Sequence, residues 1–550
     1  MKVHGKSVKV LVAFVLMLAW SIAARAQVQV SEAVQFDVSP PLSELVQRVG
    51  EQANVAGPAT AAPRVVPLHR LPAPQAEGVT RDEALQSSAG AAQQATPAIA
   101  FQGVGLGLGS FLPSSTPPDT SGAAGATQFV QWVNNSLAVF DKTSGAVVLG
   151  PVAGNTIFNG FGGPCQTRND GDPIVEYDKA AGRWVLSQFT AAAPYLECIA
   201  VSTTSDATGS YYRYAFNMGP NFADYPHMGV WPDGYYFSFN MFAPGNGPSI
   251  GGRACAFDRA AMLAGNNTAQ QQCFDSQNIF GMVPSDWDGS TAPPLGSPNY
   301  FVQFGASGSA SVLNVYKLHA DFTTPGNASF TGPLQLQVAA FLPACREEEA
   351  GPIAGGTDES GKGCVPQKGV RQKLDELSDR MMYRAAYRNL GDHEALVATH
   401  TVARIVKSNG KTQGAAIRWY ELRNLSTTPT VFQQGSFGPD SHWRWMPSIG
   451  MDKGGDIAVG YSLSGEGLHP GIAFTARTPN DPSGEMESEA IILRDKGSQE
   501  GLDRWGDYSA MSIDPADDCT FWYTTEYIER TGAAPNWSTW IASFKFPGCQ

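Results

Sequence analysis

Acidic, basic and aromatic residues recur at the start of a short repeated pattern in this chain. Each repeat opens on a polar residue, continues through alternating apolar positions, and turns through a tight polar loop into a strand-like run, as in residues 172–186 and 225–239. Carboxylates can accept hydrogen bonds or act as acid and base, and arginines can bind carboxylates through two parallel hydrogen bonds. These residue types favour binding or cleavage of an acidic or hydroxyl-rich ligand.

The candidate site residues all lie at or near these repeat openings. Those that could act on a substrate are Asp119, Asp172, Asp224, Asp507 and Tyr508. Those that could bind a ligand are Arg380, Arg444, Arg504, Trp443, Trp445, Trp505 and His227. Glycoside hydrolysis needs two carboxylates about 5–10 Å apart, which two of these aspartates could supply. The alternative role is structural, because aspartates cap backbone amides and Arg–Asp pairs lock neighbouring repeats together.

The repeats themselves predict an all-β protein. Aromatics make up 10% of the chain and charged residues only 16%, with 59 glycines and 38 prolines, which suits strands joined by tight turns. Seven units follow one another at intervals of about 50 residues, the size of a four-stranded propeller blade. We therefore expect a seven-bladed β-propeller over residues 98–550. The run Ala98 to Leu106 could supply the missing outer strand of the last unit and close the ring.

Three turn motifs resemble those of exported bacterial β-propellers loosely grouped as sialidase-like. They are the runs 140–145, 177–182 and 201–209, the last of which resembles an Asp-box hairpin with one extra residue before its glycine. The resemblance implies a propeller fold. In a sialidase, it would also imply an arginine trio and a tyrosine nucleophile with an acidic partner. The residues available for those roles are Arg380, Arg444 and Arg504 for the trio, and Tyr383 or Tyr508 for the nucleophile.

The chain also carries the marks of export. A basic segment, an apolar run and the small-residue site Ala24-Arg25-Ala26 make residues 1–26 a signal peptide. Residues 27–97, rich in Ala, Pro and Gln, are expected to be a disordered linker or propeptide.

A secreted or periplasmic location makes disulfides the default for the eight cysteines. About 105 connectivities are possible, and zinc is disfavoured because no CxxC spacing occurs. Sequential pairing is preferred: Cys165 with Cys198, Cys255 with Cys273, Cys345 with Cys364, and Cys519 with Cys549.

The charge balance excludes some partners. The formal net charge is −13, and it becomes four units more negative if residues 1–26, which hold four basic and no acidic residues, are removed. Nucleic acid is therefore not expected as a partner, and no segment after the signal peptide is apolar enough for membrane insertion. Acidic clusters at 169–172, 286–289 and 514–518 could hold a structural calcium ion, although none matches a complete calcium loop. No cofactor or catalytic metal is expected, and the protein is expected to be a monomer.

Three functions remain open on the sequence alone. The first is a non-catalytic module that binds a glycan or another extracellular ligand in the funnel formed by the repeat openings. The second is a glycoside hydrolase, sialidase-like or with two of the opening carboxylates, although no catalytic sequence motif is present. The third is a scaffold that binds a protein partner through the blade faces or the polar insert 346–368. Two facing carboxylates, at least one of them desolvated, would favour the enzyme.

Overall fold

The computed structural model describes residues 27–48, 64–66, 69, 71, 79, 81–245, 247–277, 279–304, 310–345, 363–405, 412–494 and 496–549. Strands dominate these residues, and helices are short: residues 42–48, η1 (Gly154–Phe158), α2 (Gly163–Thr167), α3 (Arg259–Leu263) and η2 (Pro325–Asn327). None of the described helices has the length and apolarity needed to cross a membrane. The predicted signal peptide, residues 1–26, lies outside the described residues.

Four separate antiparallel sheets have the four or five strands expected of a propeller blade. The first contains β7 (Thr120–Ala124), β8 (Gln128–Val133), β9 (Ser136–Asp141) and β10 (Val147–Ala153). The second contains β11 (Ile174–Asp178), β12 (Arg183–Phe189), β13 (Leu196–Ser202), β14 (Tyr211–Asn217) and β2 (Gln35–Val38). The third contains β15 (Phe222–Val230), β16 (Gly234–Phe242), β17 (Ser249–Asp258), β18 (Gln270–Ser276) and β1 (Gln29–Glu32). The fourth contains β32 (Ala510–Ile513), β33 (Phe521–Ile528), β35 (Trp537–Lys545) and β5 (Thr96–Gln102).

The remaining large sheet has 13 strands, so the expectation of seven separate blades is wrong as stated. It joins three antiparallel sets in chain order. They are β19 (Val283–Asp288), β20 (Asn299–Phe304), β21 (Val312–His319) and β22 (Ser329–Gln337); then β23 (Met382–Asn389), β24 (Glu394–Ala403), β25 (Ala415–Arg423) and β26 (Thr430–Phe437), with β4 (Leu85–Gln86) beside β26; then β27 (Trp443–Met451), β28 (Ile457–Gly465), β29 (Leu468–Arg477) and β30 (Ala490–Leu493). Parallel pairing of β19 with β23, and of Ala415 with Trp443, fuses the sets. Four two-residue strands complete the fold outside these sheets, β3 (Arg64–Val65) pairing with β6 (Ser115–Thr116) and β31 (Gln499–Glu500) with β34 (Gly532–Ala533).

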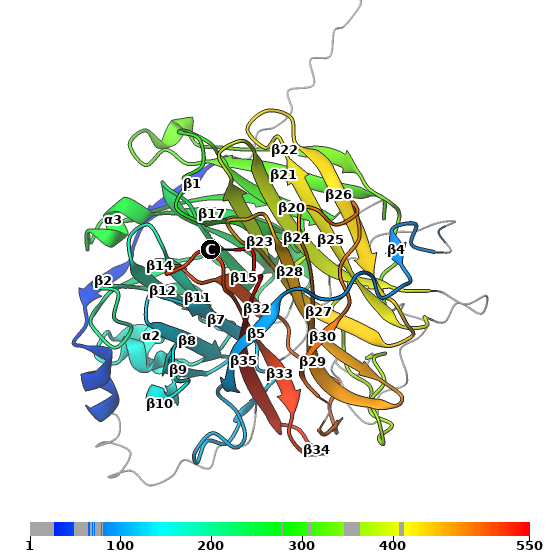
Figure 1. Ribbon diagram of the computed structural model, residues 1–550. Coiled ribbons are helices and arrows are strands. Elements are labelled where there is room, and N and C mark those ends of the chain that lie inside the picture. The colour runs from blue at the N-terminus through cyan, green and yellow to red at the C-terminus, as the bar shows by residue number, and fades with distance from the viewer. Residues whose placement is uncertain are drawn as a thin grey trace, which may run out of the picture.

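The sheets follow one another around a common centre in a propeller-like arrangement (Figure 1). The first strand of each set contacts the first strand of the next, from β7 through β11, β15, β19, β23 and β27 to β32, which contacts β7. Apolar side chains fill the space between neighbouring sheets. Trp132 and Trp184 are buried between the first two, and Phe474, Phe521 and Phe544 stack where β29 faces the last sheet. The first strands are thereby held with all their openings at one end.

The four disulfides join the cysteines that the sequence pairs: Cys165–Cys198, Cys255–Cys273, Cys345–Cys364 and Cys519–Cys549. Ring closure is also confirmed, because β5 pairs antiparallel with β35 in the last sheet, with Phe101 opposite Ile541. Most of the polar insert 346–368 lies outside the described residues. Its last six residues carry Cys364 and lead into a bridge between Val365 and Leu374.

The described parts of residues 27–97 include short strands that pair with the sheets, where the sequence predicted a disordered linker; residues 49–63, 67–68, 70, 72–78 and 80 of that range lie outside the described residues. β1 adds a strand to the edge at β18, and β2 adds one to the edge at β14. Asp82 forms a fully buried ion pair with Arg418, and Gln86 bonds the backbone of Met486. The composition of these segments does not reveal their order, because each is stabilised by partners hundreds of residues away rather than by its own apolar pattern.

Candidate functional site in the propeller centre

The repeat openings share an unusual backbone conformation. Asp119, Asp172, Tyr225, Met446 and Asp507 all have φ between 44° and 59°, in the left-handed region that L-residues seldom adopt. Each lies one to three residues before the first strand of its set or within that strand. A strained conformation repeated at one end of a ring turns these side chains toward a shared centre and is typical of positions that function constrains.

Three of these side chains form a buried carboxylate cluster. Asp119, Asp172 and Asp507 are at most 5% exposed, and each has one oxygen without a hydrogen-bond partner among the described residues. Burial raises the pKa of Asp119 well above its ordinary value, and the charges of Asp507 and Asp172 raise it further. Burial does the same to the pKa of Asp172, aided by Asp224 and Asp507. Both pKa shifts favour the protonated form of these carboxyl groups over the ionised form.

Arg504 supplies a positive charge beside this carboxylate cluster. Its Nη2 donates to Asp507 Oδ2 at 2.6 Å, its Nη1 to Asp375 Oδ2 at 2.5 Å, and its Nε to the carbonyl of Val66 at 3.0 Å. Arg504 and Asp375 are completely buried. The centre thus contains two carboxyl groups with raised pKa values next to a carboxylate that is ion-paired with Arg504, an arrangement in which one group can give a proton and another can take one.

An aromatic wall lies against the carboxylates. His227 lies parallel to the ring of Tyr383, with centroids 5.3 Å apart, and edge-on to Tyr225 and Tyr508. Burial, with a smaller contribution from Arg380, lowers the pKa of His227 to about 3, so its ring is neutral. Neither ring nitrogen has a hydrogen-bond partner among the described residues. Tyr383 donates to the carboxylate of Glu176, a tyrosine–acid pair of the kind a sialidase nucleophile needs.

Residues of the N-terminal region cover the opening of this centre. Arg380 Nη2 donates to the carbonyl of His69 at 2.8 Å, and His69 Nδ1 lies 2.8 Å from Asp224 Oδ2. Asp379 Oδ2 accepts from the Leu71 amide, while Arg504 holds Val66 as described above. Residues 64–66, 69 and 71 together are called the covering segment. Several of the side chains predicted to bind a ligand therefore bind this segment of the chain's own backbone.

Two groups of predicted ligand-binding residues lie elsewhere. Arg444 bonds Asp440 and Glu489 beside Phe437, away from Arg380 and Arg504, so the predicted arginine trio does not assemble. Trp445 and Trp505 are completely buried and pack with centroids 5.6 Å apart, and Trp443 is only 7% exposed. These indoles fill the core between sheets because burying their large apolar surface contributes more than exposing it on a funnel rim. They are not available to stack on a sugar.

Two of the three acidic clusters considered for calcium, 286–289 and 514–518, are engaged by protein groups. Asp286 and Asp288 both accept from Arg384, and Lys142 pairs with Asp514. Analysis of the sequence did not identify Asp375, Glu526 or His69, which belong to the centre. They follow no repeat opening, and only their place in the fold brings them to Arg504, the Gly506 amide and Asp224.

Comparisons with known proteins describe the fold only. No protein-family model matches the sequence, and no curated protein matches it. Polysaccharide lyase Uly1 is similar at 10% identity and a TM-score of 0.36 over 82% of this chain and 98% of that one. An α-L-arabinanase of Penicillium chrysogenum complexed with arabinobiose has 8% identity and a TM-score of 0.32 over 84% and 100%. A subtype N10 neuraminidase-like protein of A/little yellow-shouldered bat/Guatemala/060/2010 has 8% identity and a TM-score of 0.31 over 66% and 94%. At these scores the function must be argued from the site.

Proposed function

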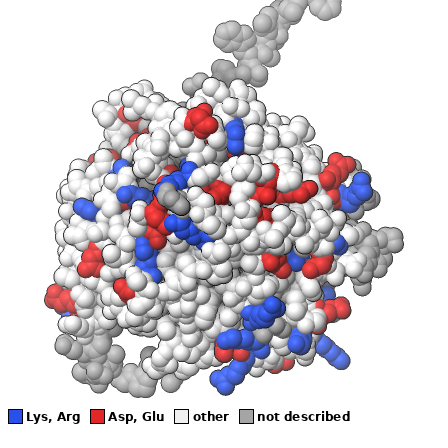
Figure 2. Space-filling view, in the orientation of Figure 1, with Lys and Arg blue, Asp and Glu red and all other residues white. Residues whose placement is uncertain are grey.

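We propose that this chain is an exported, monomeric, seven-bladed propeller that binds a glycan at the opening of its central site. On this proposal the 13-stranded sheet counts as three blades joined by parallel pairing, which with the four separate sheets makes seven. The four disulfides support an oxidising compartment. Basic and acidic side chains are interspersed on the face shown in Figure 2, which supports a partner other than nucleic acid.

The covering segment is the observation that carries this proposal. Arg380 and Arg504 donate to its carbonyls, and Asp224 and Asp379 bind its imidazole and amide. The opening therefore binds the described groups of this segment through arginines that donate and carboxylates that accept hydrogen bonds. A glycan has the same alternation, since each hydroxyl group accepts from arginine and donates to a carboxylate. Beneath it, the unpartnered oxygens of Asp119, Asp172 and Asp507 would accept from further hydroxyls once the segment leaves.

A second candidate function is glycoside hydrolysis by the same residues. It is favoured by the contrast between Asp172, whose pKa burial raises well above its ordinary value, and Asp507, which is ion-paired with Arg504. The first would protonate the leaving oxygen, and the second would serve as base or nucleophile. Tyr383 with Glu176 is the sialidase-like alternative, although Arg444 is not placed to complete an arginine trio.

Opening the site is expected to reveal its ligand. Val66→Pro removes the amide that donates to Thr116 at 2.8 Å, and His69→Ala removes the contact with Asp224. The double variant should bind its preferred glycan on an array at least about tenfold more tightly than the wild type, equivalent to about 1.4 kcal/mol. Val65→Pro with His69→Ala is the matched control, because strand β3 bonds β6 through the amides of Arg64 and Val66. No retained or cleaved glycan in the open variant would contradict the proposal, whereas released sugar would favour the hydrolase.

The covering segment is also expected to loosen as pH rises. Burial lowers the pKa of His69, but its hydrogen bond and charge interaction with Asp224 outweigh burial and leave the pKa raised above 6.5. The ion pair is therefore fully formed below about pH 6.5 and is lost as pH rises through the raised value. Hydrogen exchange at the Val66 and Leu71 amides, corrected for intrinsic rates, should show falling protection as the pH rises above about 6.5. His69→Gln should remove this dependence; equal pH dependence in both proteins would refute it.

A further inference from the structure

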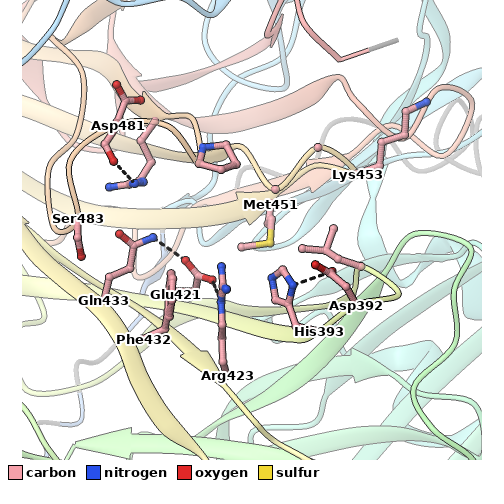
Figure 3. A pocket seen from close by; sticks show the side chains of 15 residues that line it. Asp392, His393, Glu421, Arg423, Phe432, Gln433, Met451, Lys453, Asp481 and Ser483 are labelled. Carbon is pink, nitrogen blue, oxygen red and sulfur yellow. Dashed lines mark hydrogen bonds and ion pairs between the residues drawn. The ribbon is translucent and has the colours of Figure 1, made fainter.

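A groove on the opposite end of the propeller lies between the β23–β26 and β27–β30 sets. It has a volume of 540 Å³, within the range of small-molecule sites. Its walls come from the turn after β23, the ends of β25 and β29, the start of β26 and the turn after β27. In Figure 3 the side chains of Arg423, His393 and Met451 lie next to one another at its centre, with Lys453 and Asp481 at its edges.

A stacked cation forms the floor of the groove. The guanidinium carbon of Arg423 lies 3.4 Å from the ring centroid of Phe432, which is 52% exposed and among the few large apolar side chains left open to solvent. Arg423 Nε donates to Glu421 Oε1 at 2.6 Å, and Gln433 donates to the other oxygen at 2.6 Å. The ring and the carboxylate together fix the guanidinium plane, so little side-chain entropy remains to be lost on binding.

The acids of the groove are already engaged, whereas several donors are not. Glu421 uses both oxygens on protein groups, and Asp481 Oδ2 accepts from the Thr478 amide and hydroxyl. Among the described residues no group accepts from the terminal amino groups of Arg423 or from the Lys453 ammonium. His393 binds Asp392 through Nδ1, which leaves Nε2 buried and without a partner in the same part of the chain. The groove therefore presents unsatisfied positive groups and one imidazole nitrogen.

We infer that this groove is a second ligand site, for a small carboxylate whose body packs against Met451, Leu390 and Pro479. The Arg423 guanidinium binds the carboxylate through two hydrogen bonds, and Lys453 at the rim adds a second positive charge. His393 Nε2 accepts from a hydroxyl of the ligand. A uronic acid residue has both groups on a ring with apolar C–H faces, so an acidic saccharide is the form of carboxylate that fits all three contacts.

The inference is tested by calorimetric titration of the full chain with sodium galacturonate, galactose and sodium benzoate. Galacturonate should bind saturably, and galactose, which has no carboxylate, at least about tenfold more weakly. If benzoate binds as tightly as galacturonate, the result would support a carboxylate site and identify an aromatic acid as its ligand. Binding of galactose equal to that of galacturonate, or no heat with either acid, would overturn the inference.

Variants separate this groove from other basic surface groups. Arg423→Gln should weaken galacturonate binding about tenfold or more, and Arg423→Lys should restore part of it because the charge remains without the two-pronged geometry. Lys496→Gln removes an exposed, ion-paired lysine elsewhere and should leave binding unchanged. The Val66→Pro/His69→Ala variant should also bind galacturonate in the groove as the wild type does. Binding in the groove is thereby tested independently of binding at the central site. Equal affinity in Arg423→Gln and the wild type would overturn the assignment.

Discussion

Arg504→Gln is expected to lower the free energy of unfolding by about 3–5 kcal/mol. The substitution removes the positive charge of the fully buried Arg504, whose guanidinium contacts Asp375 at 2.5 Å and Asp507 at 2.6 Å. Both carboxylates then remain buried without a positive charge and must either ionise at high cost or take up protons. Urea unfolding followed by tryptophan fluorescence would measure the change.

Two variants show that the cost comes from the unbalanced carboxylates. Arg504→Met combined with Asp375→Leu and Asp507→Leu removes all three charges and should recover most of the lost stability, because an apolar replacement of a buried ion pair is often neutral. Lys496→Gln, which breaks the exposed pair with Glu529, should change stability by no more than about 0.5 kcal/mol. An Arg504→Gln protein as stable as the wild type would show that other groups balance Asp375 and Asp507.

Glu197→Gln is expected to stabilise the protein at neutral pH. Glu197 is completely buried in β13, opposite Phe189 and Phe216 in the neighbouring strands, and burial raises its pKa to about 8. Because the folded pKa lies above the unfolded value of 4.5, stability is complete below pH 4.5 and is lost as pH rises toward 8. At pH 7 this loss is roughly 3 kcal/mol, since each pKa unit corresponds to about 1.4 kcal/mol.

The glutamine variant should therefore be more stable than the wild type by roughly 3 kcal/mol at pH 7 and about equally stable at pH 4. Urea midpoints at the two pH values give the comparison. Glu500→Gln, which changes an exposed carboxylate, is the control and should show no such divergence. A difference between Glu197→Gln and the wild type that does not change between pH 4 and 7 would mean that burial does not control this carboxyl group.

The architecture was largely predictable because its signals are local. Alternating apolar residues and tight turns define strands from neighbouring positions alone, so β8, β9, β11 and β12 appear where the repeats place them. The cysteine pairing was predictable for the same reason, as each pair lies within or beside one repeat. The fused 13-stranded sheet was not, because it forms through parallel pairing of β19 with β23, and nothing in either segment specifies that partner. Arg384 of β23 also bonds Asp286 and Asp288 of β19.

The site was predictable only where a residue's function follows from its place in the repeat. Asp119, Asp172, Asp507 and His227 meet at the centre because repeat openings converge there. Trp445 and Trp505 occupy similar positions but turn into the core, since an indole is driven to apolar surroundings wherever they are within reach. Whether a side chain faces the axis or the core depends on the backbone conformation of one residue, which composition does not reveal.

The strands contributed by the N-terminal region set the order in which this molecule can fold. Ser31 of β1 bonds Gln271, 240 residues later, and Ile99 of β5 bonds Ser543, 444 residues later. Pairing between such distant segments pays a large loop-closure entropy before any contact forms, which slows folding. Until their partners have been made, β1, β2 and β5 are unpaired strand segments open to pairing with other chains. A chaperone that shields β1, β2 and β5 during synthesis would therefore raise the yield of folded protein more than any stabilising substitution in the finished ring.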